Sequence, residues 1–134
     1  MKAHRCKTTW ILAIAFLAAS VPAFAHHGVA AYDSGKQINV SGTVKDWFWA
    51  NPHCILQLDA TDSHGQVVHW MMETGNPSDL VNNGWSRQSM KVGDKITVTI
   101  QPAKNGRPIG RIMEVELPNG QKLKTWAQPA SNPQ

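Results

Sequence analysis

Hydrophobic and polar residues alternate along most of the chain after residue 36. The alternation runs through five segments, which are separated by residues typical of turns. A period of two places successive side chains on opposite faces, and this is the pattern of a half-buried β-strand. We therefore predict five strands, within residues 37–49, 53–60, 66–74, 95–101 and 111–118.

The phase of the alternation predicts which side chains face the core. In the first predicted strand, the apolar residues on one face are Ile38, Val40, Val44 and Phe48. In the last, the residues in phase are Ile109, Met113, Val115 and Leu117. Gly42 interrupts the apolar face of the first strand, which indicates a bulge or a sharp coil at that point.

A short helix is predicted at residues 75–85, between the third and fourth strands. Asn76 is a suitable N-cap, Pro77 fits the first helical position, and Gly84 fits the end of the helix. Three strands, a short helix and two further strands follow the order of the OB-fold, a five-stranded Greek-key barrel. We therefore predict an all-β domain with a small α component, built as an OB-like barrel. An open β-sandwich is the alternative that the same strands could build.

The first 25 residues have the order of a secretory signal peptide. A basic stretch precedes an apolar run at residues 10–19, and the small residues at 23–25 offer a cleavage site. The apolar run is shorter than the roughly 20 residues that a membrane-spanning helix needs. We expect cleavage after Ala25, export to the periplasm and no membrane span in the mature chain.

The mature chain divides by composition into a leader at 26–36, the OB-like barrel at 37–126 and a flexible tail at 127–134. The signal peptide carries three of the 13 basic residues and none of the nine acidic ones, so most of the net charge of +4 leaves with it. This does not favour nucleic-acid binding, which needs a clustered basic face. We expect a monomer.

Cys54 is the one cysteine that remains after cleavage, so an intrachain disulfide is excluded. Its position alternates in step with the apolar residues Leu56 and Leu58, so it is expected on the same face of the predicted strand. We therefore interpret Cys54 as a small core side chain rather than a thiolate ligand.

Short motifs spread over most of the mature chain make the sequence resemble an uncharacterised bacterial family, domain of unknown function family 6152. The motifs are HHG at 26–28, SGTV at 41–44, WANPH at 49–53, W-x-x-E at 70–73, NPSDL at 76–80, GW at 84–85, GD at 93–94 and LPNGQKL at 117–123. The resemblance implies periplasmic residence and one small β domain, and it implies no activity or ligand. Cys54 and His69 do not belong to the family pattern.

Two adjacent histidines follow the predicted cleavage site. Cleavage would make His26 the first residue, and its α-amine, with a pKa near 8, can become a nitrogen ligand at modest cost. The amine, the ring of His26 and the amide and ring of His27 could then chelate a metal, with His53 adding an imidazole. Such nitrogen-rich sets suit Cu(II), so we consider copper before zinc.

Glu73 could supply an oxygen ligand to this site, and His69, on the same face of its strand, a nitrogen. Each residue also has an ordinary explanation. Histidines in a leader often only hydrate, and His53 could bond to the turn before its strand. Glu73 could accept backbone N–H groups at the start of the helix or pair with Arg87. The sequence leaves both interpretations open.

The alternative function is a binding module without metal. Trp49 and Trp70 could present a surface to a peptide, a glycan or a partner protein, since OB barrels bind oligomers on their sheet surface. The same tryptophans could instead fill or cap the core. No Ser-His-Asp or Cys-His motif and no phosphate loop is visible in the sequence. An enzymatic function is therefore not favoured.

Overall fold

The computed structural model describes residues 30–125 of the 134-residue chain. Its elements are β1 (Ile38–Phe48), β2 (Ile55–Thr61), β3 (Val67–Glu73), α3 (Pro77–Asn82), β4 (Lys95–Pro102), β5 (Ile109–Glu116) and β6 (Lys122–Lys124). The five strands and the helix predicted from the sequence are all present, and β6 forms the second arm of the small hairpin that ends the described region.

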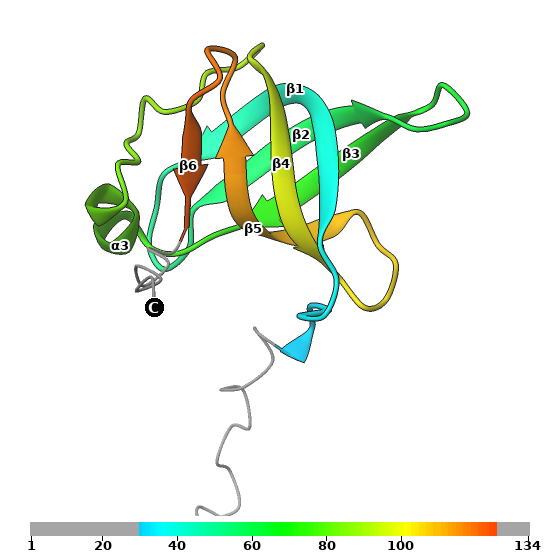
Figure 1. Ribbon diagram of the computed structural model, residues 1–134, viewed down its shortest axis with the longest axis horizontal. Helices are drawn as coiled ribbons and strands as arrows, with labels where there is room; N and C mark the ends of the chain where they lie inside the picture. The colour runs from blue at the N-terminus through cyan, green and yellow to red at the C-terminus, as the bar shows by residue number, and fades with distance from the viewer. Residues whose placement is uncertain (1–29, 126–134) are drawn as a thin grey trace, which may run out of the picture. The chain divides into compact units, whose positions relative to one another are not determined.

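The strands form one sheet in the order β3-β2-β1-β4-β5-β6, and β3 also pairs with β5. The β3–β5 pairing is parallel and joins residues 71–73 to residues 109–111, whereas the other pairings are antiparallel. This pairing closes the sheet into a barrel (Figure 1). The prediction of an all-β, OB-like barrel with a helix between the third and fourth strands is therefore confirmed, and the open sandwich is excluded.

β1 belongs to both halves of the barrel. Its residues 38–43 pair with β4, and its residues 43–48 pair with β2. Gly42 lies where the strand passes from one partner to the other, and a Cβ there would collide with the backbone carbonyl of Asp59. The close approach of two backbones thus requires glycine at this position.

A bulge in β1 corrects one predicted core residue. The register with β2 shifts between Val44 and Asp46, so the side chains beyond it change faces. Trp47 pairs with the buried Leu56 and packs against the core, whereas the side chain of Phe48 is 46% exposed. The prediction that Phe48 faces the core was wrong because strict alternation cannot represent an extra residue.

A second irregularity corrects the predicted phase of β5. The β4–β5 register shifts between Thr99 and Ile100, which pair with Glu114 and Ile112 and leave Met113 as the extra residue. Ile112 is therefore fully buried, while Ile109 and Met113 are only partly buried. The predictions for Ile109 and Met113 were wrong for the same reason as that for Phe48. Val115 is buried as predicted.

The helix begins as its sequence predicts. The side chain of Asn76 accepts a hydrogen bond from the backbone N–H of Asp79 at 3.0 Å, and Pro77 occupies the first turn. Gly84 follows the helix with φ of +83°, a conformation that favours glycine. Leu80 is the buried residue of the helix, so the helix contributes one large side chain to the core.

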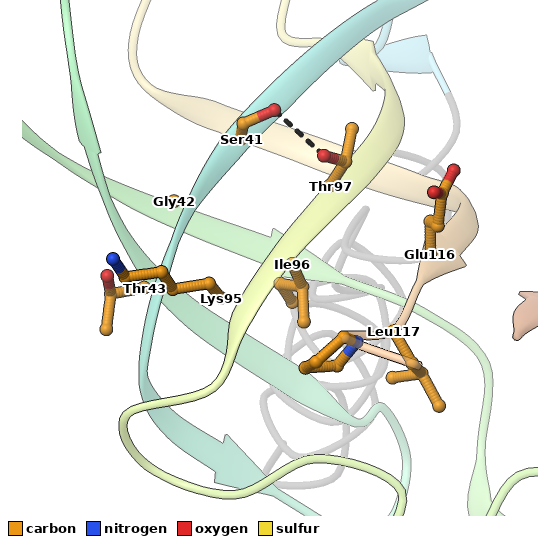
Figure 2. Close-up of a pocket in the computed structure, with 9 residues that line it drawn as sticks. Ser41, Gly42, Thr43, Lys95, Ile96, Thr97, Glu116 and Leu117 are labelled. Carbon is orange, nitrogen blue, oxygen red and sulfur yellow. Dashed lines mark hydrogen bonds between the residues drawn. The ribbon is translucent and has the colours of Figure 1, made fainter. Parts of the chain in front are cut away.

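The outer surface where β1, β4, β5 and β6 run side by side carries paired polar side chains, and we call it the ladder face. The Oγ of Ser41 lies 2.8 Å from the Oγ1 of Thr97 (Figure 2), and the Oγ1 of Thr99 donates to Asn39 at 2.8 Å. Beside them, lysines of β6 form ion pairs with glutamates of β5: Lys122 with Glu114 and Glu116, and Lys124 with Glu114. Polar groups on this face therefore satisfy one another.

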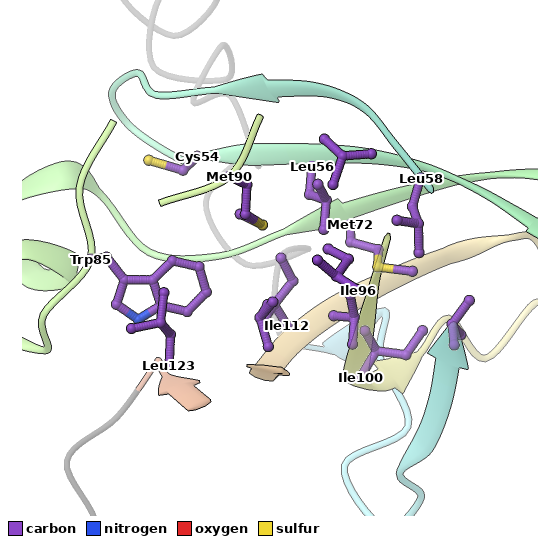
Figure 3. Close-up of a cluster of buried hydrophobic side chains, with 14 of the residues drawn as sticks. Cys54, Leu56, Leu58, Met72, Trp85, Met90, Ile96, Ile100, Ile112 and Leu123 are labelled. Carbon is purple, nitrogen blue, oxygen red and sulfur yellow. The ribbon is translucent and has the colours of Figure 1, made fainter. Parts of the chain in front are cut away.

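The core fills the inside of the barrel with apolar side chains from its strands, from α3 and from the segment that follows α3. Figure 3 shows Leu56, Leu58, Met72, Ile96, Ile100 and Ile112 gathered between the strands, with Trp85 and Leu123 at one end. Cys54 lies among these side chains with no exposed surface, so its predicted role as a core residue is confirmed. Burial raises the pKa of the Cys54 thiol above its ordinary value.

Candidate functional site

His53 is the one predicted metal ligand that the structure places in an open loop. It lies between β1 and β2, it is exposed, and its Nδ1 is 3.2 Å from the carbonyl oxygen of Thr74. A carbonyl only accepts hydrogen bonds, so this contact requires the proton on Nδ1 and leaves Nε2 with a lone pair in the neutral ring. Histidines that bind metals are commonly oriented by such a bond.

Backbone pairing explains why the Thr74 carbonyl is available to the ring. The N–H of Cys54 donates to the carbonyl of Gly75 at 3.1 Å, and the N–H of Thr74 donates to the carbonyl of Cys54 at 3.0 Å. These hydrogen bonds use the carbonyls of Gly75 and Cys54 and leave the carbonyl of Thr74 available. The loop before β2 then places the imidazole of His53 against it.

The segment before β1 packs on the barrel through Tyr32. Its backbone follows the end of β4, with the N–H of Asp33 donating to Pro102 at 2.9 Å and the N–H of Lys104 donating to Ala31 at 3.0 Å. Tyr32 is buried, with 8% of its surface exposed, and its hydroxyl donates to the carboxylate of Glu73. Residues 31–33 of the predicted leader are therefore attached to the barrel.

Burial and the Glu73 carboxylate raise the pKa of Tyr32 above its ordinary value, and the nearby positive charge of Arg111 opposes them. Tyr32 is therefore held in its neutral, hydrogen-bonding form. Glu73 contacts Tyr32 rather than the start of the helix, which Asn76 caps. Tyr32 was not predicted as a site residue from the sequence, although it is the single tyrosine of the chain and interrupts a segment of small and polar residues.

Tyr32 and His53 contact consecutive residues of the chain. The Tyr32 hydroxyl binds Glu73, the last residue of β3, and the His53 ring binds Thr74, the next residue. The structure thus brings the segment before β1 and the loop before β2 to the same end of β3. His26 and His27, which were predicted to complete a metal site, lie outside the described residues.

His69 is not brought to this end of β3. Its Nδ1 lies 2.6 Å from the Oδ1 of Asp59, its cross-strand partner. It shares a strand face with Glu73 but is four residues away, which corresponds to about 13 Å along a strand. Within residues 30–125, no group of three or more histidine, cysteine, aspartate or glutamate side chains is placed to hold a metal.

The two tryptophans that were predicted as a ligand surface lie in different parts of the barrel. Trp49 follows β1 and contacts Trp47 edge-on, with ring centroids 5.8 Å apart. Trp70 is opposite Leu58 in the β2–β3 ladder. Both are partly buried and pack against the core, which leaves part of each side chain exposed. They do not meet in one surface.

The exposed large apolar side chains of the strands lie on the outer surface formed by the end of β1, β2 and β3, with Val67 and Phe48 at opposite ends of it. We call this the open face and define it by Phe48, Val67 and Met71, which are 46%, 57% and 50% exposed. A hollow of about 270 Å³ lies on it, lined by Lys45, Gln57, Leu58, Asp59, His69, Trp70 and Met71. Strict alternation wrongly placed Phe48 in the core, because of the bulge in β1. Alternation placed Met71 correctly on the face away from Met72, but only tryptophans were predicted as a ligand surface.

In the described part of the chain, we find no helix with the length and apolar character required to cross a membrane.

Comparisons with known proteins bear on the family alone. No curated protein and no solved structure matches the chain. Residues 14–113 match a family described as a family of unknown function (DUF6152). This match covers most of the chain and all the motifs noted above except LPNGQKL at 117–123. The chain therefore belongs to this family of unknown function.

Proposed function

We propose that this protein is exported to the periplasm and binds a transition metal there, copper before zinc. The ligands are the α-amine and imidazole of His26, the neighbouring His27, and Nε2 of His53. The observation that carries the proposal is that Tyr32 and His53 contact the consecutive residues Glu73 and Thr74.

Chain length supports this arrangement. Ala31, whose carbonyl is bonded to the barrel, is the fifth residue after His26. A fully extended segment of that length spans at most about 17 Å. Because Tyr32 is attached at the end of β3, where His53 also binds, we infer that the segment before it brings His26 to the ring of His53.

Ligand chemistry supports copper over zinc. A terminal amine and several imidazoles form a nitrogen-rich set without thiolate, and Cu(II) binds such sets more tightly than the other divalent ions of its series. Cys54, the one thiol in the described residues, is buried and inside the core, so it is no ligand at this site. Glu73 is engaged by Tyr32, and we assign it the role of holding the segment before β1.

The proposal is tested by Cu(II) titration of a chain that begins at His26, followed by competition and by electron paramagnetic resonance. Acetylation of the α-amine should weaken binding at least about 100-fold, since it removes the ligand that begins the chelate. His53→Ala should weaken binding about tenfold, in the range found when a supporting metal contact is lost, and should change the nitrogen hyperfine pattern.

His64→Ala is the matched control, because His64 is an exposed histidine in the β2–β3 turn. It should leave Cu(II) affinity and the spectrum unchanged. Equal and weak binding by the free, acetylated and His53→Ala chains would contradict the metal proposal.

In that outcome, a binding module without metal becomes the better proposal, and one observation favours it. Three large apolar side chains are about half exposed on the open face, and one of them, Met71, lines a hollow of about 270 Å³. This is the β2–β3 surface on which OB barrels commonly bind their ligands. Its exposed apolar residues are Phe48, Val67 and Met71, rather than the predicted pair of tryptophans.

A further inference from the structure

β3 has an edge that is only partly covered. It pairs with β2 over its whole length, from Val67 to Glu73, but with β5 only at residues 71–73. Within the described residues, the segment from Val67 to Trp70 has no strand on its other side. Figure 1 shows the β2–β3 hairpin extending beyond β5 at this point.

Hydrogen bonds show which backbone groups of this edge point outward. At one end of the β2–β3 ladder, the N–H of Asp62 donates to Gln66; at the other, the N–H of Thr74 donates to Cys54. The even-numbered residues of β3 therefore bond to β2. In an antiparallel ladder the residues between them point their N–H and C=O away. The N–H of Met71 does so, donating to Pro108 at 3.0 Å.

Val67 and His69 consequently present four outward backbone groups that have no strand partner within residues 30–125. Exposed edges in proteins are usually protected by bulges, prolines or lysines. The β2–β3 ladder has no register shift, and the segment Val67–Trp70 contains neither proline nor lysine. The side chain of Val67 is 57% exposed. This stretch therefore lacks the bulge, proline and lysine that commonly block pairing with another strand.

We propose that a second copy of this chain pairs with the edge of β3 in an antiparallel manner, about a two-fold axis at Val68. Val67 of each copy then lies opposite His69 of the other, and each pair exchanges two backbone hydrogen bonds. The four outward groups of each copy are thereby satisfied. The result is an isologous contact in which both copies use the same surface.

A second copy fits this edge because the edge is complementary to itself. The two outward residues lie symmetrically on either side of Val68, as a two-fold axis requires. Val68 faces its own counterpart in a non-hydrogen-bonded pair, where β-branched side chains approach closely. This proposal departs from the monomer expected from the sequence, because alternation along residues 66–74 does not show which edge of a strand is covered.

The test is sedimentation equilibrium of the metal-free, processed protein with two substitutions at one position. Val67→Pro removes the outward N–H without removing a bond of the β2–β3 ladder, and proline is tolerated at the first residue of a strand. Val67→Ala also removes the branched valine side chain but keeps the N–H. Wild type should dimerise reversibly, Val67→Ala should weaken the dimer by less than about threefold, and Val67→Pro by at least about tenfold.

Amide hydrogen exchange of the wild-type protein provides a second measurement that needs no variant. The amides of Val67 and His69 should exchange freely in dilute solution and become protected as concentration rises. A wild-type protein that remains monomeric up to about 1 mM, the upper range of weak association, would overturn the proposal. So would a dimer that Val67→Pro leaves intact, or protection of these amides only when an extended peptide is added. Because the protein is metal-free, these outcomes are independent of the copper titration.

Discussion

Both outer faces of the barrel carry paired polar side chains, including the Asp59–His69 pair on the open face, but the two faces differ in how much apolar surface they expose. On the ladder face, Ser41 bonds to Thr97, Asn39 to Thr99, and the β6 lysines pair with the β5 glutamates. On the open face, large apolar side chains remain about half exposed. Beside them, the edge of β3 from Val67 to Trp70 has no strand partner within residues 30–125. Each face carries a hollow, of about 440 Å³ on the ladder face and about 270 Å³ on the open face. The difference between the faces therefore lies in the exposed apolar side chains and the β3 edge on the open side.

The difference arises from the way one strand is shared. β1 pairs with β4 before Gly42–Thr43 and with β2 after it, so a single strand contributes to both faces. Its bulge then turns Phe48 outward on the open face. The contrast between the faces is therefore set at two positions of β1. It can be tested at Gly42, at Tyr32 beside the end of β3 and at Ser41 on the ladder face.

Gly42→Ala should have the largest effect on stability, because Gly42 lies where β1 passes from pairing with β4 to pairing with β2. The added Cβ would collide with the Asp59 carbonyl, which is backbone and cannot rotate away. We expect a loss of about 3 kcal/mol in the free energy of unfolding, at the upper end of overpacking effects. Urea denaturation measures this loss.

Gly35→Ala is the matched control, since a Cβ there would only reach ordinary contact with the Asp33 side chain at 3.5 Å. Its free energy of unfolding should stay within about 0.5 kcal/mol of wild type. Equal stability of Gly42→Ala and Gly35→Ala would show that the approach of β1 to β2 is looser than described.

Tyr32→Phe should have an intermediate effect, because it releases the segment that is held at the end of β3. Loss of the hydrogen bond to the Glu73 carboxylate should lower the free energy of unfolding by about 1.5 kcal/mol at neutral pH. Thermal and urea unfolding both measure this change.

The same substitution should change how stability depends on pH. The pKa of Tyr32 is raised in the folded chain, so above the ordinary value near 10 the unfolded chain releases this proton first. The stability that the hydroxyl contributes is complete below about pH 10 and is lost as pH rises through the raised pKa. Wild type should therefore lose stability more steeply than Tyr32→Phe above pH 10. Parallel curves would contradict the assigned contact.

Ser41→Ala should have the smallest effect, because the ladder face is exposed to water. Removing one hydroxyl of the Ser41–Thr97 pair should cost about 0.5 kcal/mol, since water can replace the lost partner. The midpoint of urea denaturation measures it. A loss comparable to that of Tyr32→Phe would mean that the polar ladder contributes more to stability than exposed pairs usually do.

The sequence predicted the elements of the fold because local signals agreed with one another. Alternation located the strands to within about two residues, as is usual for such boundaries, and Asn76 and Pro77 marked the start of the helix. The errors at Phe48, Ile109 and Met113 all follow from bulges in β1 and β5. A bulge depends on how two strands fit together, so its position is absent from the pattern of either strand alone.

The candidate site was less predictable because it depends on contacts between distant segments. The sequence identified His53 but gave no reason to link it with Tyr32, which reaches the same end of β3 through the path of the leader. It grouped Glu73 with His69 by strand parity. Parity places both on one face, but the spacing along β3 separates them. Two residues on the same face of a strand therefore need not belong to the same site.

The parallel pairing of residues 71–73 with residues 109–111 determines how late in synthesis the barrel can close. The two partners lie far apart in the chain, and everything from α3 to the β4–β5 turn must be made before they can meet. A hairpin such as β2–β3 can form as soon as both of its strands have been synthesised. The barrel can close only when nearly the whole domain has been made. A chain truncated before β5 would therefore remain an open sheet in which both edge strands lack a partner on one side.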